Sequence, residues 1–253
     1  MQSFKIVIPA RYGASRLPGK PLLPIAGKPM IAHVCERALE AGAGEVVVAT
    51  DDERIRDAVA FIGVRAVMTR PEHNSGTERI AEVAEVLGWA DSQIIVNLQG
   101  DEPLMQPVLI RRLAAVLAGQ ARAEIATLAA PIRERAEVFN PNAVKVVLDK
   151  NDYALYFSRA PIPWHRDSFV ATDQGLPEGF PYLRHIGIYA YSAGFLRRYV
   201  AWPASPLESV ESLEQLRILW NGERILVLPV ERAPEAGVDT EADLRRVQSL
   251  LHP

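Results

Sequence analysis

Near its start the chain carries the stretch Phe4-Lys-Ile-Val-Ile-Pro-Ala-Arg-Tyr-Gly-Ala-Ser-Arg-Leu-Pro-Gly-Lys-Pro-Leu-Leu23. Its first residues are mostly apolar and β-branched, which predicts a buried strand that ends near Pro9. The loop that follows carries the cations Arg11, Arg16 and Lys20 among glycines. Glycine lets a backbone approach a ligand closely and cations neutralise phosphate, so this loop predicts a phosphate-binding site at the end of a strand. Its length and glycine spacing fit neither the dinucleotide motif nor the ATP-binding motif, which indicates a nucleotide held in another way.

Strand-like and helix-like segments alternate along the rest of the first half. The expected strands and helices follow one another at residues 5–8, 30–41, 45–50, 52–61, 64–68, 77–87 and 93–98. Buried β-branched runs separated by amphipathic helices predict an α/β fold, a mostly parallel sheet covered by helices on both faces. Ligands of such sheets bind at the carboxyl ends of the strands, where Pro9, Asp51 and Gln99 fall.

The second half has a different pattern. The expected elements are strands at 125–130, 144–148, 187–191 and 225–229, with helices at 209–220 and 240–251. Proline and aromatic residues are frequent between the central strands, including Trp164, Phe169 and Phe180. This region could be a lid, a subunit contact or a plain surface loop. We expect one domain over 1–253 with an elaboration at about 130–200.

Composition excludes several classes of protein. The 253 residues carry a net charge of −3, which argues against nucleic acid as the main partner. A single cysteine, Cys35, excludes an internal disulfide and is expected to be a buried structural thiol in a reducing compartment. The first strand leaves no room for a signal peptide, and no apolar run reaches the ~20 residues of a membrane span. We therefore expect a cytoplasmic protein with no membrane insertion.

Two acidic motifs follow expected strands. In Asn97-Leu-Gln-Gly-Asp-Glu-Pro103, Asp101 can project into the ligand crevice, although Gly-Asp is also a common turn. In Pro234-Glu-Ala-Gly-Val-Asp-Thr240, Asp239 or Thr240 would by default cap the last helix. Two carboxylates from separate loops are also what Mg²⁺ on a triphosphate requires, so their pairing is a hypothesis from the fold.

Three other segments have both a structural and a functional interpretation. Ser75 or Thr77 can cap the helix after His73-Asn-Ser-Gly-Thr-Glu-Arg79, and its backbone amides with Arg79 could also read a base or a ribose. His185, Gly187, Tyr189 and Tyr191 share one face of a strand, which is either an ordinary sheet face or a pocket wall. The polar residues Glu208, Glu211 and Gln215 fall at helical spacing, which by itself predicts a solvated helix face.

Together these stretches resemble one family along nearly the whole chain. The opening Pro-Ala-Arg-Tyr-Gly-Ala-Ser-Arg-Leu-Pro-Gly-Lys-Pro-Leu is similar to the signature of the sugar-acid cytidylyltransferases. The branch that acts on 3-deoxy-manno-octulosonate (Kdo) is indicated by the order of six further motifs: His-Asn-Ser-Gly-Thr-Glu-Arg, Asn-Leu-Gln-Gly-Asp-Glu-Pro, Ser-Arg-Ala-Pro-Ile-Pro, His-Ile-Gly-Ile-Tyr, Glu-Ser-Leu-Glu-Gln-Leu-Arg and Gly-Val-Asp-Thr.

The resemblance implies a nucleotidyltransferase-type fold, usually a homodimer, that uses CTP and Mg²⁺ to form CMP-Kdo and pyrophosphate for lipopolysaccharide biosynthesis. It implies catalytic roles for Arg11, Arg16, Lys20, Asp101 and Asp239, the two aspartates holding the metal. The implied CTP contacts are Pro9, Ala10, Arg11, Arg16, Lys20, Ser75, Gly76, Arg79 and Gln99. The implied sugar-acid contacts are Arg159, His185, Tyr189, Glu214 and Gln215, and the elaboration at about 130–200 would carry dimer and sugar contacts.

Other functions remain to be separated from this one. The closest is cytidylyl transfer to sialic acid or to an amino analogue of Kdo, because small changes in a pocket alter specificity. A non-catalytic nucleotide-binding module would not need the pair Asp101 and Asp239 together with Lys20. A uridylyltransferase with an acyltransferase tail is disfavoured because no hexapeptide repeats follow.

Overall fold

The computed structural model describes residues 3–13, 17–73, 75–170 and 175–251. The chain forms two compact units. Unit 1 contains residues up to 119, then 188–200 and the segment from 234 onward, and unit 2 contains 120–187 and 201–233. The expectation of one domain with an elaboration at about 130–200 stays a prediction.

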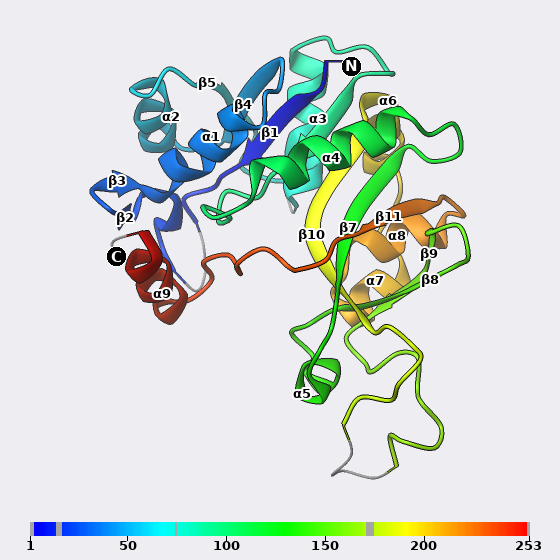
Figure 1. The fold of residues 1–253 in the computed structure, drawn as a ribbon. Helices are drawn as coiled ribbons and strands as arrows, with labels where there is room; N and C mark the ends of the chain where they lie inside the picture. Colours follow the sequence, from blue (N-terminus) through cyan, green and yellow to red (C-terminus); the bar gives the residue numbers. More distant parts are fainter. Residues whose placement is uncertain (1–2, 14–16, 74, 171–174, 252–253) are drawn as a thin grey trace. The chain divides into compact units, whose positions relative to one another are not determined.

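Unit 1 is built on a five-membered run of strands. They lie in the order β10, β6, β1, β4, β5 (Figure 1). Their bounds are β1 (Lys5–Pro9), β4 (Glu45–Thr50), β5 (Arg65–Met68), β6 (Ile94–Asn97) and, of β10 (Leu183–Ser192), the part from residue 188. The pairs of β1 with β4, β1 with β6, and β4 with β5 are parallel, whereas β10 runs antiparallel to β6. The predicted mostly parallel α/β sheet is confirmed.

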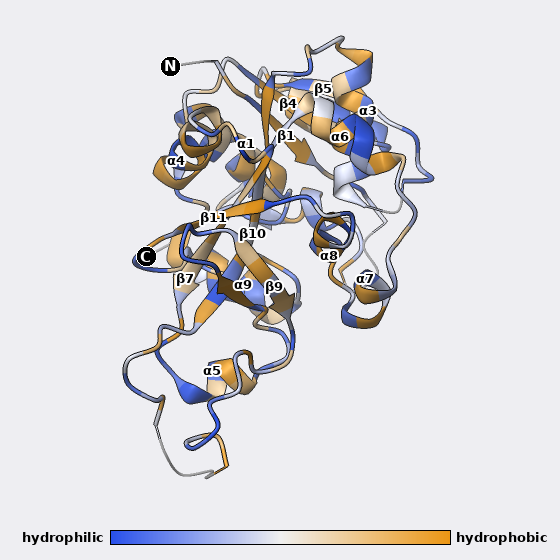
Figure 2. Cartoon of the chain, turned by 90° about the vertical axis from the view of Figure 1, so that its right-hand side faces the viewer, coloured by the Kyte–Doolittle hydropathy of each residue, from blue (hydrophilic) through white to orange (hydrophobic). Residues whose placement is uncertain are grey.

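Amphipathic helices cover both faces of this sheet. Helices α1, α2 and α4 lie on one face, and α3 packs beside α6 on the other (Figure 1). Their bounds are α1 (Met30–Glu40), α2 (Glu53–Ala60), α3 (Gly76–Val86), α4 (Pro107–Ala118), α6 (Ala193–Val200) and α9 (Glu241–Leu251), with the short η1 (Lys20–Leu22) and the hairpin of β2 (Pro24–Ile25) and β3 (Lys28–Pro29). Ile6, Val7 and Ile8 are fully buried, and Figure 2 shows β1 as largely hydrophobic. Burial on both faces explains why these strands are continuous apolar runs.

Unit 2 contains a smaller, mixed set of strands. β11 pairs in parallel with β7, whereas β8 pairs antiparallel with β9 and with the first part of β10. The elements are β7 (Ile125–Pro131), α5 (Arg135–Phe139), β8 (Lys145–Leu148), β9 (Ala154–Ser158), α7 (Pro206–Glu211), α8 (Gln215–Trp220) and β11 (Ile225–Pro229). Strand β9 and the helices α4, α5 and α6 were not expected from the sequence.

The prediction of one helix over 209–220 is wrong. Ser205 begins α7 with a capping box to Glu208, and Ser212 then adopts a left-handed backbone with φ 51°, which ends that helix. Helix α8 starts again at Gln215. The break replaces a regular helical face with a turn whose Glu211 and Ser212 carbonyls accept hydrogen bonds from Arg159.

Aromatic residues gather in unit 2 where the sequence is rich in proline. Phe169 packs edge-on against Phe139 and Trp164, with ring centroids 5.0 Å and 5.4 Å away, and tilts against Tyr182. Trp164 remains 55% exposed although it joins this cluster. An ordered cluster with an exposed tryptophan is typical of a contact surface more than of a plain loop.

The burial expected for the Cys35 thiol is confirmed. The thiol is buried in α1, and this burial, with the nearby Glu36 as a smaller cause, raises its pKa to about 12. A thiol of this kind is protonated and unreactive at neutral pH.

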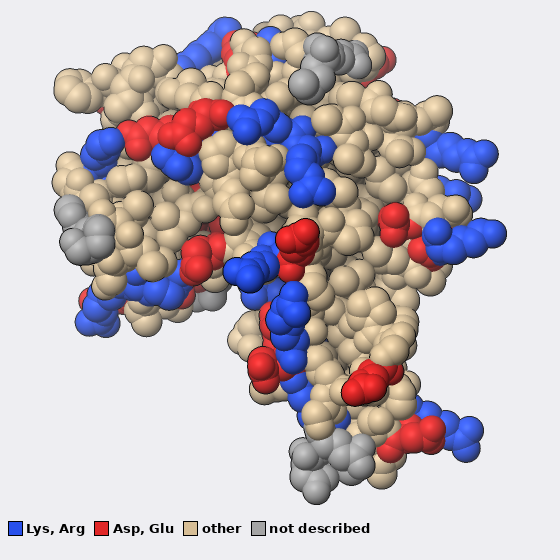
Figure 3. Space-filling view, in the orientation of Figure 1, with Lys and Arg blue, Asp and Glu red and all other residues tan. Residues whose placement is uncertain are grey.

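Within the described ranges, no helix has the length and apolarity needed to cross a bilayer. On the face seen in Figure 3, acidic side chains lie among the basic ones.

Candidate functional site

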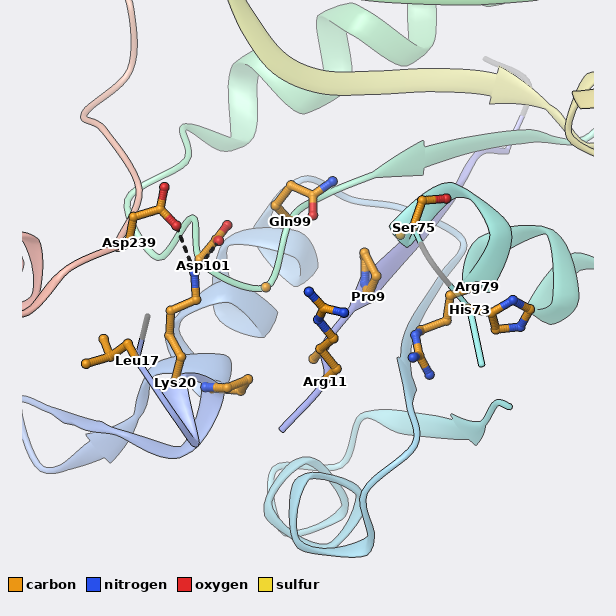
Figure 4. Close-up of a pocket in the computed structure, with 14 residues that line it drawn as sticks. Pro9, Arg11, Leu17, Lys20, His73, Ser75, Arg79, Gln99, Asp101 and Asp239 are labelled. Atoms are coloured by element: carbon orange, nitrogen blue, oxygen red, sulfur yellow. Dashed lines mark hydrogen bonds and ion pairs between the residues drawn. The ribbon is translucent and has the colours of Figure 1, made fainter. Parts of the chain in front are cut away.

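A cavity of about 300 Å³ opens in unit 1 at the carboxyl ends of β1 and β6. Its size is in the range of ligand sites. Figure 4 shows Lys20, Asp101 and Asp239 at one end, Ser75, Arg79 and His73 at the other, and Arg11 between them. The lining residues are Pro9, Ala10, Arg11, Leu17, Lys20, Pro21, His73, Ser75, Gly76, Arg79, Gln99, Gly100, Asp101 and Asp239.

Close backbone packing brings the two aspartates together. The amide of Val238 donates to the carbonyl of Asp101 over 2.9 Å, so the loop after β6 lies against the segment before α9. Gly237 makes this approach possible, because a Cβ there would lie 2.8 Å from the Asp101 carbonyl oxygen. Asp101 and Asp239 are therefore neighbours through the backbone as well as through the side chains, and their pairing on a metal stays a prediction.

Lys20 joins both carboxylates. Its ammonium donates to Asp101 Oδ2 at 2.6 Å, to Asp239 Oδ1 at 3.2 Å and to the carbonyl of Val238 at 2.9 Å. Gly19, with φ 68°, turns the chain into η1 and places Lys20 at its start. Three hard oxygen atoms thus converge on one cation at the acidic end of the cavity.

The other end of the cavity is the start of α3. Ser75 is the N-cap and accepts a hydrogen bond from the amide of Glu78, which confirms the structural interpretation of this motif. Gly76 lies against Pro9, where a Cβ would come within 3.2 Å of the proline ring. Ser75 and Gly76 thus place the N-terminal end of α3 at the wall of the cavity. The N-terminus of a helix attracts polar and anionic groups.

Arg79 is almost fully buried behind this helix start. Its guanidinium donates to Asp51 Oδ2 over 2.8 Å and to the hydroxyl of Thr69. A buried guanidinium needs such partners, since an unpaired buried charge is costly. Arg79 thus fixes α3 to the ends of β4 and β5, and it also lines the cavity.

Sequence reasoning missed part of this lining. His73 lines the cavity and its Nε2 contacts Glu82 of α3, which ties the segment before the helix to the helix itself. Gly100 also lines it, and Gln99 donates from Nε2 to Asn97 Oδ1 over 3.1 Å. Helix capping gives no reason for a histidine at position 73, and this could have indicated a role for His73. The role of Gly100 depends on a tertiary contact with Pro9, which no local sequence pattern shows.

The structure gathers the described nucleotide-side predictions around one cavity. They are Pro9, Ala10, Arg11, Lys20, Ser75, Gly76, Arg79, Gln99, Asp101 and Asp239. Arg16 lies outside the described residues.

Comparison with known proteins identifies the chain. A family model described as cytidylyltransferase matches residues 5–225. A 3-deoxy-manno-octulosonate cytidylyltransferase of Methylococcus capsulatus is 64% identical over 98% of this chain and 96% of its own length. One of Idiomarina loihiensis is 58% identical over 98% of both chains. The chain belongs to the 3-deoxy-manno-octulosonate cytidylyltransferase family.

A solved structure adds the fold to this sequence likeness. It is described as CMP:2-keto-3-deoxy-manno-octonic acid synthetase complexed with CTP, and it is 47% identical. It aligns with a TM-score of 0.89 over 99% of this chain and 98% of its own. The nucleotidyltransferase-type fold predicted from the sequence is thereby confirmed, and this chain is a cytidylyltransferase.

The predicted sugar-side residues of this cytidylyltransferase are distributed over both units. Tyr189 is buried in unit 1, opposite Asn97 in the pairing of β10 with β6. Arg159, His185, Glu214 and Gln215 belong to unit 2. Glu214 is the N-cap of α8, and the side chain of Gln215, the first residue of that helix, is buried. These five residues stay a predicted set.

Arg159 is held by backbone carbonyls in unit 2. Its Nε donates to the carbonyl of Glu211 at 2.7 Å and its Nη1 to that of Pro141 at 2.9 Å. The Glu211 carboxylate in turn accepts from the amide of Arg159 and from the hydroxyl of Ser158. A guanidinium has five N–H donors, so these bonds orient Arg159 and leave donors for a carboxylate ligand. The turn at Ser212, not a continuous helix, supplies the Glu211 carbonyl and also the Ser212 carbonyl, which accepts from Nη2 at 3.4 Å.

His185 is a neutral imidazole in this environment. Burial, followed by the charge of Arg184, lowers its pKa to about 3. The ring packs edge-on against Phe157 at 5.0 Å, and its Nε2 shares a hydrogen bond with the Thr127 hydroxyl at 3.0 Å. A neutral histidine on a strand can offer a donor or an acceptor to a sugar hydroxyl without adding charge.

The lowered pKa of His185 predicts a pH-dependent stability. Above the unfolded-state pKa near 6.5 the ring is neutral in the folded and the unfolded chain, so it does not change the unfolding free energy with pH. Between pH 6.5 and about 3, the unfolded chain binds a proton at this ring and the folded chain does not. The unfolding free energy therefore falls with acidification, by at most about 1.4 kcal/mol per pH unit and by less where solvent reaches the ring.

Urea unfolding of the wild type and of His185→Gln at pH 7, 6 and 5 measures this slope. The difference between the two proteins should shrink as pH falls. His165→Gln, a replacement in unit 2 outside the predicted site, serves as the control for losing a histidine. Parallel curves for the wild type and His185→Gln would refute the neutral state of His185.

Proposed function

We propose that this cytidylyltransferase transfers CMP from CTP to the anomeric hydroxyl of Kdo and releases pyrophosphate, in the pathway to lipopolysaccharide. One observation carries the proposal: a single cavity combines a helix start, a row of cations and a pair of carboxylates. This combination suits a nucleoside triphosphate, whose phosphates need cations and whose metal needs carboxylates. The names of the relatives supply the cytidine and the sugar acid.

The cations of the opening loop would hold the triphosphate. Arg11 lies between the two ends of the cavity (Figure 4), where it can follow a phosphate chain that runs from the helix start toward the carboxylates. Lys20 lies at the acidic end. With Arg16, they would stabilise the charge that develops as the bond to pyrophosphate breaks in an in-line displacement.

Asp101 and Asp239 would hold Mg²⁺. Among the described residues no group of three or more His, Cys, Asp or Glu could hold a metal unaided. The donor set still fits, because two carboxylates and the Val238 carbonyl already converge on a cation, and Mg²⁺ on a nucleotide commonly takes one or two carboxylates and completes its shell with phosphate and water. The metal would supply polarisation of the α-phosphate.

The remaining roles follow from position. Ser75, Gly76 and Arg79 would contact the cytidine, with Pro9, Ala10 and Gln99 along its edge. Arg159, His185, Tyr189, Glu214 and Gln215 would contact Kdo, with Arg159 toward its carboxylate, because a planar guanidinium matches a carboxylate. The surface around the exposed Trp164 is the one expected to take part in a homodimer. We expect the enzyme to be cytoplasmic.

Pyrophosphate release across a substrate panel tests the proposed function. The purified chain is assayed with Kdo, amino-Kdo or sialic acid, each with CTP or UTP, with Mg²⁺ or with EDTA. Turnover should be highest for Kdo with CTP and should stop with EDTA. Preference for another sugar acid or for UTP would refute the named substrates, and full turnover with EDTA would refute the metal.

A further inference from the structure

The ammonium of Lys20 lies at the point where the ligands of a divalent cation would converge. It touches both carboxylates and the Val238 carbonyl, at 2.6, 3.2 and 2.9 Å. The Lys20 side chain is 13% exposed, whereas those of Asp101 and Asp239 are 31% and 53% exposed. The cation is thus the most enclosed member of the group, and two negative charges meet around one positive charge.

The proposed function asks something different of the same side chain. There Lys20 neutralises the triphosphate, while Asp101 and Asp239 hold a divalent cation. One ammonium has three donors, and here all three contacts go to the oxygens that the metal would use. Both sets of contacts cannot be made at full strength together.

We propose that Lys20 is an internal counter-ion: it holds Asp101 and Asp239 together before substrate binds, and it transfers its charge to the triphosphate when a divalent cation takes the carboxylates. This inference rests on the proposed function for its second half only. Its first half, competition between Lys20 and a metal, follows from the contacts themselves.

Electrostatics decides the direction of the effect. The two carboxylates and the ammonium that they share carry a net charge of −1 together, and the carboxylates hold the ammonium between them. A metal that binds without nucleotide must therefore displace this ammonium. A triphosphate gives the displaced ammonium a new partner, which removes that cost. Metal and CTP therefore strengthen each other's binding, and the coupling is reciprocal.

The test is metal binding by Lys20→Met, with Mn²⁺ as the probe. Without nucleotide, the variant should bind Mn²⁺ about tenfold more tightly than the wild type, because the competing cation is gone. With CTP present and no Kdo, the order should reverse, since the variant lacks the ammonium that the triphosphate needs. Free Mn²⁺ measured by electron paramagnetic resonance gives both affinities. Lys28→Met, which removes an exposed lysine that pairs with Glu36, is the matched control and should change neither.

Each outcome decides the proposal. Equal or weaker Mn²⁺ binding by the variant without CTP would overturn it. The methionine variant loses a cation between two carboxylates, so its thermal unfolding is measured in EDTA to verify that it is folded. Lys20→Gln, in which a neutral side chain can still hydrogen-bond, is the second variant. Its Mn²⁺ affinities relative to the wild type, without and with CTP, should follow the same order. Activity on CTP and Kdo is scored separately, in the wild type. Tighter Mn²⁺ binding by the Lys20 variants together with a wild type that makes no CMP-Kdo would support the competition and refute the proposed function.

Discussion

Asp101→Asn is expected to lower kcat/KM for CMP-Kdo formation by about a thousandfold or more. The amide keeps the shape of the side chain but loses the charge that a hard cation requires, and metal polarisation of a phosphoryl oxygen is worth several kcal/mol, at about 1.4 kcal/mol for each factor of ten. Among the described residues, Asp101 and Asp239 are the two carboxylates that pair with Lys20. When Asp101 is replaced, Asp239 is the one that remains, and a single carboxylate cannot supply the pair.

The fold should survive this change. The Asp101 side chain is partly exposed, and Lys20 keeps its contacts to Asp239 and to the Val238 carbonyl. Circular dichroism and thermal unfolding verify the fold, and pyrophosphate release measures the activity. Asp52→Asn is the control, because Asp52 caps α2 and asparagine caps a helix as well as aspartate does. Undiminished activity in Asp101→Asn would remove the metal assignment.

Gly100→Ala is expected to cost both stability and activity. An added Cβ would lie 2.8 Å from the carbonyl oxygen of Pro9 and 3.4 Å from the Cβ of Ala10. The obstacle is backbone, and the amide of Ala10 is tied to the carbonyl of Ala49, so the strand end cannot move aside cheaply. We expect the unfolding free energy to fall by about 1–3 kcal/mol, as in other overpacked sites.

Activity should fall further than stability alone implies. Asp101 is the next residue, and a displacement of about 1 Å at a reacting group can cost a factor of about 100 in rate. Gly175→Ala is the matched control, because no other heavy atom lies within 4 Å of its added Cβ. Urea unfolding and steady-state kinetics at saturating CTP separate the two losses. Wild-type kinetics in Gly100→Ala would show that the strand end is not part of the site.

Much of unit 1 could be predicted because its signals are local. The β-branched runs of β1, β4 and β6 are buried on both faces, so each is recognisable from its own residues. Ser75 could be identified as a cap from its neighbours alone. The carboxyl ends of parallel strands share one edge, which is why Arg11, Gln99 and Asp101 could be expected around one cavity.

Other features depend on contacts between distant parts of the chain. The break at Ser212 follows from a capping box and a left-handed residue, neither of which changes the helical spacing of Glu208 and Glu211. Sequence spacing could not show that Asp101 and Asp239 meet, since their meeting depends on the close approach at Gly237. It could not show that Lys20 lies between them either, because an isolated lysine in a glycine-rich loop indicates only phosphate.

The contact between Asp101 and the segment at Gly237 and Val238 also has a consequence for biosynthesis of the chain. A ribosome must add every residue through Asp239 before the carboxylate pair can exist. A product that stops after β11 would carry the strands, the helix start and Arg11, but Lys20 would face a single carboxylate. Premature termination or proteolytic loss of this last segment should therefore yield a protein that lacks the carboxylate pair and does not turn over substrate. The same loss removes Val238 and Val247 from the buried cluster that they form with Ile25 and Met30.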